Sequence, residues 1–152
     1  MAFLAPNSVR DFLGVAAAAE VASASYRAAF APILSGEELA RRTPESFVPR
    51  FADSLARLRV AEAGGRIVGF SLVTGTHLDM LFVDPAAQGS GGGRALLAEV
   101  VARGTCSLEC FRANLPARRF YERAGWVVTR GYSRPFAGQL HDFVFYERCG
   151  AT

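Results

Sequence analysis

The chain has 152 residues, of which 51% are hydrophobic and 20% are charged, so it can form one hydrophobic core and is too apolar for a disordered protein. Its net charge is +3, and all 17 basic residues are arginine because the sequence contains no lysine. This excludes a Schiff-base lysine, a lysine that anchors pyridoxal phosphate and the lysine of a P-loop. The arginines form no run beyond pairs, which argues against a nucleic-acid partner.

The cysteines and the N-terminal segment indicate whether disulfides, a metal site, a signal peptide or a membrane span are to be expected. Cys106, Cys110 and Cys149 match neither a disulfide framework nor the spacing of a zinc site, so we predict no metal. Cys106 and Cys110 are expected on one face of a strand, as small core residues. The N-terminus lacks a basic region, and the uncharged apolar stretch Phe12–Ala19 is short, which predicts neither a signal peptide nor a membrane span. We therefore expect a single cytoplasmic domain over residues 1–152, with no membrane partner.

The first third of the sequence is predicted to be mainly helical. Ser8–Phe12 is a short predicted strand, and Leu13–Phe30 is alanine-rich with apolar residues at helical spacing. Two shorter helices follow, one from Ser35 to Arg42 and one from Thr43 to about Ala56. The first of these begins with a capping box, in which Glu38 lies three residues after Ser35.

The rest of the chain is predicted to form a sheet with two helices inserted. Three strands separated by glycine turns form an antiparallel meander: Leu58–Ala63, Arg66–Thr74 and His77–Val83. The helix Gly91–Arg103 leads to a strand at Cys106–Phe111, and this connection makes that strand parallel to the one before it. A further helix and two strands complete the chain: Leu115–Ala124, capped by Asn114 and stopped by Gly125, then Trp126–Ser133 and Asp142–Arg148, which flank a loop at Pro135–Gly138.

The segment between the third meander strand and the next helix has the composition of a phosphate cradle. It reads Gln88-Gly-Ser-Gly-Gly-Gly93, and glycines let backbone N–H groups approach an anion at a helix start. In a Gly-x-Gly-x-x-Gly pattern the sixth position falls on Arg94 or Leu96, and no lysine follows, so neither a Rossmann fingerprint nor a P-loop fits. The remaining pattern is Gln-x-x-Gly-x-Gly.

With its downstream motifs, this turn resembles the GCN5-related N-acetyltransferase (GNAT) family. Leu81-Phe-Val-Asp-Pro85 leads into the turn, and Asn114-Leu-Pro-Ala117, Phe120-Tyr-Glu-Arg-Ala-Gly-Trp126 and Phe145-Tyr-Glu-Arg148 follow in the family's order. The resemblance covers nearly the whole chain from about residue 8. It implies an α/β (α+β) GNAT fold: a mixed, mostly antiparallel sheet of six to seven strands, flanked by about four helices, with central parallel strands that splay apart.

The resemblance also implies an acetyl-CoA-dependent N-acetyltransferase that acts on a primary amine of a small molecule or peptide, by direct transfer in a ternary complex. The pantetheine arm would bond to the backbone of Leu81, Phe82 and Val83 and contact Asn114, for which a plain helix cap is the alternative. The pyrophosphate would lie against the turn and the helix start, where a solvated Arg94 is the alternative to a phosphate contact. The implied turn residues are Gln88, Gly89, Ser90, Gly91, Gly92, Gly93 and Arg94.

Catalytic groups follow from the same resemblance. Tyr121 matches the tyrosine that protonates the departing CoA thiolate, and the alternative is a half-buried helix aromatic. In the histone-acetylating branch a glutamate eleven residues before the motif glutamine is the base, and this position is His77 here, whose ordinary pKa is close to neutral. Asp79, expected on the same strand face, Glu109 and no single base are the alternatives. Without a recognisable activating histidine, the cysteines are not expected to carry the acyl group.

The acceptor site is expected between the N-terminal helices and the loop Arg134–His141. Aromatic side chains among several arginines favour an apolar or aromatic acceptor with an acidic group, although these rings can equally be core: Tyr26, Phe30, Phe47, Phe51 and Phe136. The protein is expected to act alone or as a homodimer. The alternative function is a catalytically inactive CoA-binding regulatory module, against which the presence of both Asn114 and Tyr121 argues.

Overall fold

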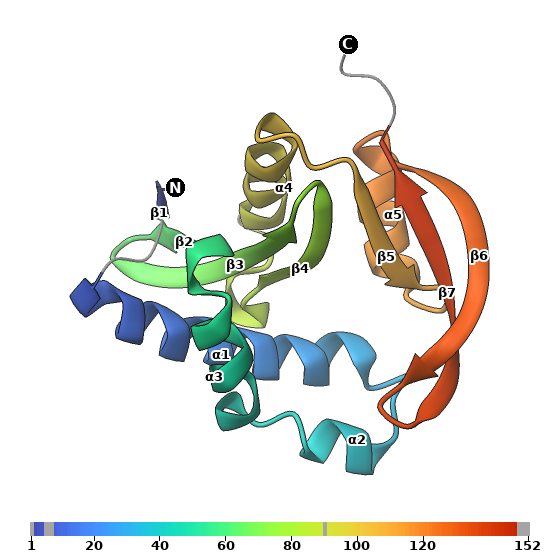
Figure 1. Ribbon diagram of the computed structural model, residues 1–152, viewed down its shortest axis with the longest axis horizontal. Coiled ribbons are helices and arrows are strands. Elements are labelled where there is room, and N and C mark those ends of the chain that lie inside the picture. Colours follow the sequence, from blue (N-terminus) through green and yellow to red (C-terminus); the bar gives the residue numbers. More distant parts are fainter. Residues whose placement is uncertain (1, 5–7, 90, 149–152) are drawn as a thin grey trace.

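The computed structural model describes residues 2–4, 8–89 and 91–148, with side chains from Gly14 onward. A seven-stranded sheet runs through the molecule in the order β1-β2-β3-β4-β5-β7-β6 (Figure 1). Its strands are β1 (Ala2–Leu4), β2 (Leu58–Ala63), β3 (Arg66–Thr74), β4 (His77–Val83), β5 (Ser107–Phe111), β6 (Val127–Phe136) and β7 (Gln139–Glu147). The helices are α1 (Ser8–Phe30), α2 (Gly36–Ala40), α3 (Pro44–Asp53), α4 (Gly92–Ala102) and α5 (Leu115–Arg123), with short 3-10 helices η1 (Leu55–Arg57) and η2 (Pro85–Ala87). The predicted α/β fold class and the mixed, mostly antiparallel sheet are confirmed.

The predicted N-terminal strand was wrong. Ser8–Phe12 is the first part of α1, and the edge strand is Ala2–Leu4, which pairs antiparallel with β2. No proline separates this segment from the alanine-rich helix that follows. Because extending an existing helix is far easier than starting one, the helix continues upstream to Ser8.

The C-terminal strands are longer than the sequence predicted. They form a hairpin in which Pro135 pairs with Leu140, so Pro135 and Phe136 of the predicted loop belong to β6. The turn is Ala137-Gly138, with φ of +52° and +83°. The proline is tolerated because β6 is an edge strand of the sheet.

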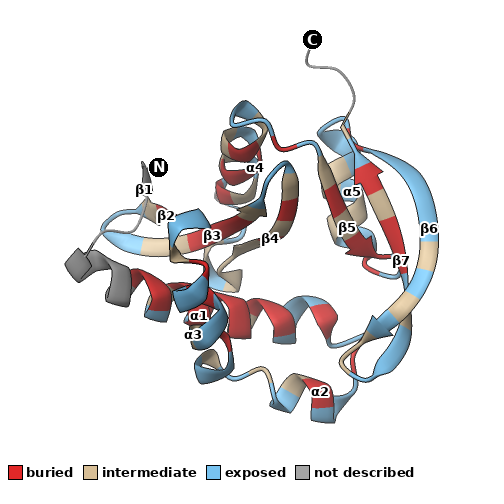
Figure 2. Cartoon of the chain, viewed as in Figure 1, coloured by how far each residue is buried: buried red, intermediate tan, exposed pale blue. Residues whose placement is uncertain are grey.

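The helices cover the two faces of the sheet, and each face has its own hydrophobic cluster (Figures 1 and 2). On one face α1 and α3 contribute Tyr26 and Phe51, which pack with Phe70 of β3. On the other face α4 packs near Trp126 and Tyr146. The predicted capping box is confirmed: the Glu38 N–H donates to Ser35 Oγ at 3.2 Å, and the Ser35 N–H donates to the Glu38 carboxylate at 3.1 Å.

The sheet opens between β4 and β5, the parallel pair that the sequence predicted. Only His77↔Ser107 and Leu78↔Leu108 are paired, after which the strands diverge (Figure 1). On its other edge β4 contains a bulge: Leu78 pairs with Val73 and Met80 with Leu72, which leaves Asp79 without a partner residue in β3.

The bulge changes which way β4 presents its side chains. Leu78 packs in the cluster of α4, whereas Met80 packs in the cluster of α1, although the two residues would share a face in a regular strand. The expectation that His77 and Asp79 lie on one face assumed this regular alternation, which the bulge interrupts.

A search of the described residues finds no helix that is long and apolar enough to cross a membrane.

Candidate active site

Two cavities meet where β4 and β5 separate. The first, called the turn cavity, has a volume of about 750 Å³ and opens at the glycine turn between β4 and α4. The second, called the splay cavity, has a volume of about 340 Å³ and lies between the two strands. The residues that line both cavities are Leu81, Phe82, Asn114, Ala117 and Tyr121. A ligand in one cavity can therefore meet a ligand in the other at these side chains.

The glycine turn forms one wall of the turn cavity. Gly89 and Gly91 have φ of +87° and +85°, a backbone conformation that glycine adopts without strain. Gly91 is also the N-cap of α4, and no side chain caps this helix start. The predicted turn residues that line the cavity are Gln88, Gly89, Gly91, Gly92, Gly93 and Arg94, whereas Ser90 lies outside the described residues. An uncapped helix start beside left-handed glycines suits an anionic ligand.

The C-terminal half of β4 forms the opposite wall of this cavity. Leu81, Phe82 and Val83 all line it, and the edge of β4 that faces β5 has no strand partner after Leu78 in the described sheet. An extended ligand can thus use the free backbone groups of this edge, as an added strand would. The Val83 carbonyl also accepts a hydrogen bond of 3.2 Å from the Ser25 hydroxyl of α1.

Asn114 and Tyr121 come from the start and the middle of α5. Asn114 caps this helix, as predicted, and its Oδ1 accepts from the Ala117 N–H at 3.4 Å. It is 9% exposed, so the side chain is held at the junction of the cavities. Burial, with smaller contributions from Cys110 and Tyr146, raises the pKa of Tyr121. Its hydroxyl therefore keeps its proton throughout the neutral range.

The predicted base candidates, His77 and Asp79, both line the splay cavity. His77 Nδ1 lies 2.9 Å from the Ser107 hydroxyl, and its ring stacks on Phe145 at 5.8 Å between centroids. Asp79 accepts from the Thr74 hydroxyl at 2.5 Å and lies 3.4 Å from the Arg57 guanidinium. The carboxylate of Asp79 is thus paired with a guanidinium, whereas the hydrogen bond of His77 to a described residue is made with a neutral hydroxyl.

Glu109 was predicted only as an alternative base. It lies on β5 in the splay cavity, where Arg134 donates to both carboxylate oxygens and the Tyr132 hydroxyl donates to one of them. Burial alone would raise the pKa of Glu109, but the hydrogen bonds from Arg134 and Tyr132 outweigh burial and hold the pKa below its ordinary value. Its place in a predicted strand does not reveal its arginine partner, because Arg134 comes from the distant strand β6.

The cysteines differ from the prediction in one respect. Cys110 is buried in the second hydrophobic cluster, but Cys106 is exposed and lies just before the first residue of β5. Cys149 lies outside the described residues. Burial raises the pKa of the Cys110 thiol to about 12, so this residue is not a thiolate at neutral pH.

The predicted acceptor aromatics divide into two groups. Tyr26, Phe30 and Phe136 line the splay cavity, together with Arg50 and Arg134. Phe47 and Phe51 belong to the same hydrophobic cluster as Tyr26 and Phe30 but do not line this cavity.

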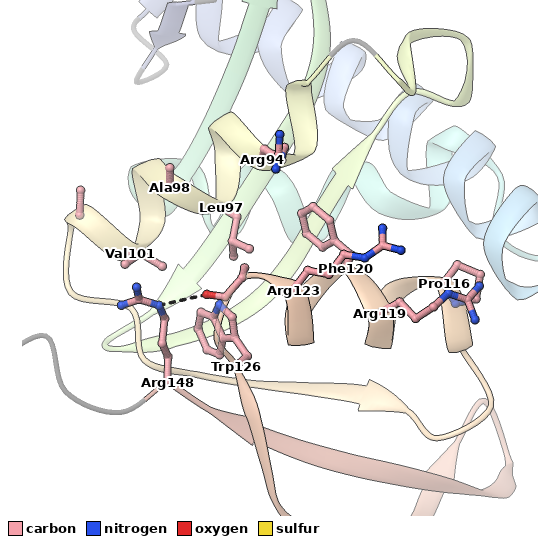
Figure 3. A pocket seen from close by; sticks show the side chains of 12 residues that line it. Arg94, Leu97, Ala98, Val101, Pro116, Arg119, Phe120, Arg123, Trp126 and Arg148 are labelled. Atoms are coloured by element: carbon pink, nitrogen blue, oxygen red, sulfur yellow. Dashed lines mark hydrogen bonds between the residues drawn. The ribbon is translucent and has the colours of Figure 1, made fainter.

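A third cavity of about 810 Å³ lies between α4 and α5 (Figure 3). Trp126 lines it with 2% of its surface exposed, and the indole N–H has no hydrogen-bond partner among the described residues. Arg148 donates to the Ala124 carbonyl at 3.4 Å, and the Arg94, Arg119 and Arg123 side chains also line the cavity (Figure 3). The described residues that line it are apolar side chains and arginines, so this described lining provides no acid, base or nucleophile for a reaction.

Within the described parts of the chain, no three His, Cys, Asp or Glu side chains lie close enough together to hold a metal ion.

Comparisons with known proteins agree with this geometry. The family model described as "Acetyltransferase (GNAT) domain" matches residues 20–142. The chain is 36% identical over 63 residues to the peptidyl-lysine N-acetyltransferase YjaB of Escherichia coli (strain K12) and 41% identical over 64 residues to the Salmonella typhimurium protein of the same name. Each of these alignments covers 41% of this chain and only 43% of the relative.

Solved structures extend the similarity to the whole fold. The apo form of YjaB from Escherichia coli has a TM-score of 0.74 at 25% identity, covering 99% of this chain and 100% of that chain. The PaiA N-acetyltransferase from Thermoplasma acidophilum, solved in complex with coenzyme A, has a TM-score of 0.66 at 20% identity, covering 98% and 100%. At this identity the second similarity concerns the fold alone.

Proposed function

Because the chain belongs to the GNAT acetyltransferase domain family, we propose that it transfers an acetyl group from acetyl-CoA to a primary amine. The observation that carries this proposal is the meeting of the turn cavity and the splay cavity at Asn114, Tyr121 and the end of β4. Donor and acceptor can occupy separate cavities and react where these join. Direct transfer in a ternary complex needs this arrangement, because holding both reactants in place lowers the entropic part of the barrier.

Acetyl-CoA is the donor in this proposal, and it occupies the turn cavity. The N–H groups of the glycine turn and of the α4 start hold the pyrophosphate, with Gln88 and Arg94 beside it. The pantetheine arm lies along Leu81–Val83 of β4 and contacts Asn114. The coenzyme A complex of the related Thermoplasma protein supports this choice of donor.

The chemistry then needs a base for the amine and an acid for the thiolate. The amine nitrogen attacks the thioester carbonyl, so that a C–N bond forms and the C–S bond breaks. Tyr121 supplies a proton to the departing sulfur, because a tyrosine hydroxyl still carries its proton at neutral pH. The proton of the amine goes to the base.

His77 is the proposed base, because it lines the splay cavity and carries no ion pair among the described residues. Asp79 is the alternative, although Arg57 and Thr74 already bind its carboxylate. Glu109 is the least suitable, because Arg134 holds its pKa down despite burial. The pH dependence of kcat/KM in His77→Ala tests this assignment: an unchanged profile and turnover would show that His77 is not the base.

The proposed function is tested by measuring thiol release from acetyl-CoA over a panel of amines, with CoA binding measured by calorimetry beside it. The panel includes a polyamine, free amino acids and a lysine-containing peptide, since the curated relatives are named for peptidyl-lysine. We expect CoA binding together with turnover of at least one amine. Binding without any turnover would instead indicate a catalytically inactive CoA-binding regulatory module.

We also propose that the protein works in the cytoplasm as a single domain, alone or as a homodimer. These remain predictions from the sequence. Gel filtration with light scattering distinguishes the two assemblies, and a mass other than that of one or two chains would contradict both.

A further inference from the structure

An aromatic wall runs along the splay cavity and leads to the strand where the two cavities join. It consists of Tyr26 and Phe30 on α1, Phe111 on β5 and Phe136 in the β6–β7 hairpin, all of which line the cavity. Successive ring centroids are 4.7, 5.0 and 5.1 Å apart along the order Tyr26, Phe30, Phe111 and Phe136. Tyr26 also lies 5.5 Å from Phe82 of β4. A flat apolar group can therefore contact several rings at once.

The two acidic residues of this cavity are already neutralised. Asp79 pairs with Arg57, and Glu109 pairs with Arg134. Neither carboxylate is therefore free to attract a second cation. A polycationic acceptor, such as a polyamine, finds no unpaired negative charge on the part of the cavity wall that the structure describes.

Two further guanidinium groups near the wall have no anionic partner among the described residues. Arg50 lines the cavity from α3 and makes no ion pair or hydrogen bond within the described structure through its side chain. The Arg42 guanidinium lies 5.7 Å from the Tyr26 ring centre and 5.6 Å from the Phe136 ring centre. Its Nε is buried and has no hydrogen-bond partner there either.

The positive charges of both arginines act on the same tyrosine. Burial raises the pKa of Tyr26, while the positive charges of Arg42 and Arg50 act in the opposite direction. Tyr26, Arg42 and Arg50 come from α1, the link between α2 and α3, and α3, so three separate segments place these groups together. The part of the aromatic wall around Tyr26 thus lies under the influence of two positive charges that have no ion-pair partner among the described residues.

We propose that the acceptor is an amine with an aromatic body and a free carboxylate, of which aromatic amino acids are the simplest members. Its ring contacts Tyr26, Phe30 and Phe136, and its carboxylate binds the Arg50 guanidinium with support from Arg42. Its amine faces the junction of the cavities at Tyr121. This inference rests on the proposed acetyl transfer and adds the class of acceptor to it.

Matched amines test the role of the carboxylate. The first set is phenylalanine, phenylalaninamide and 2-phenylethylamine, in which the ring is constant and the anion is neutralised or removed. The second set is 4-(aminomethyl)benzoate and benzylamine, in which the carboxylate lies far from the amine. In at least one set we expect kcat/KM for the acid to exceed that of its neutral counterparts by about 10-fold or more, because hydrogen bonds to charged groups are the stronger ones.

A matched pair of variants tests the arginine. In Arg50→Gln we expect the preference for the acid to fall to within about threefold of unity, since the loss of one charged hydrogen bond accounts for about a 10-fold effect. Arg41→Gln is the control, because Arg41 is an exposed arginine of the adjacent segment that lines neither cavity. The control should keep the preference of the parent chain.

The outcomes separate the two proposals. Neutral amines turned over as well as the acids, or a lysine-containing peptide preferred to every acid, would overturn the acceptor class and leave acetyl transfer intact. An unchanged preference in Arg50→Gln would overturn the role of Arg50. Failure to release thiol with any amine, in a protein that binds CoA, would overturn the proposed function and the acceptor class with it.

Discussion

At the scale of single residues, Tyr121 is the proposed general acid of the reaction. It lies at the junction of the two cavities and is surrounded by the aromatic rings of the second cluster, with Trp126 and Tyr146 at 6.2 and 6.1 Å. Burial is the main reason for its raised pKa. An acid that loses its proton only at strongly alkaline pH is available for the whole physiological range.

Tyr121→Phe is predicted to lower kcat by about 100-fold or more, the usual contribution of a positioned general acid. The ring is retained, so CoA affinity and the unfolding temperature should stay close to those of the parent chain. Steady-state kinetics and calorimetry check this. A kcat within about twofold of the parent value would contradict the acid role.

The ion pair of Glu109 should make the free energy of unfolding depend on pH. The pKa of its carboxyl is lower in the folded state than in the unfolded chain, so its ion pair stabilises the fold above the unfolded pKa. This stabilisation is lost as pH falls through the folded pKa. Glu109→Gln should therefore lower the free energy of unfolding at pH 7 by roughly 1 kcal/mol, since the Arg134 partner is partly exposed.

Urea unfolding of the parent and of Glu109→Gln at several pH values measures this difference. We expect the two unfolding free energies to approach each other as pH falls below the ordinary range of a glutamate. A difference that is the same at acid and neutral pH would show that the carboxylate charge does not contribute.

At the scale of the elements, the glycine turn combines a backbone requirement with a binding role. Gly91 has a positive φ, and a Cβ built there meets no atom within 4 Å. The added Cβ of an alanine at this position would cause no steric clash with the protein. The effect of backbone strain on stability can therefore be measured separately from the effect on ligand binding. Gly64 in the β2–β3 hairpin is a matched control, since it also has a positive φ and open surroundings.

Gly91→Ala and Gly64→Ala are each predicted to lower the free energy of unfolding by about 1 kcal/mol, the usual cost of a left-handed backbone at alanine. Only Gly91→Ala should also weaken CoA binding, by about 10-fold, if one charged hydrogen bond to the phosphate is lost. Chemical unfolding and calorimetry measure the two effects. Equal CoA affinity in both variants would remove the turn from the phosphate site.

The elements also show what can be predicted from a sequence. The strands Leu58–Ala63, Arg66–Thr74 and His77–Val83 have the predicted bounds, because alternation and glycine turns are local signals. The bulge at Asp79 has no such signal: Leu78 and Met80 alternate as in a regular strand. Their opposite faces arise from pairing with β3, which is a long-range interaction.

At the scale of the whole molecule, the fold gathers the site from segments far apart in sequence. The glycine turn, Asn114 and Tyr121 were predicted as one site because family motifs link them, and they do line one cavity. The acceptor wall could not be predicted in the same way. Phe30 and Phe47 are both apolar residues of predicted helices and both belong to the same core cluster, and only the packing of α1 and α3 decides that the first also lines the cavity while the second does not.

The central claim is that donor and acceptor meet in the gap between β4 and β5 and react directly. Initial velocities measured while both acetyl-CoA and a productive amine are varied test it most directly. A ternary complex predicts double-reciprocal lines that intersect. Parallel lines would mean that CoA leaves before the amine binds, and an acetylated enzyme would then have to replace direct transfer in this account.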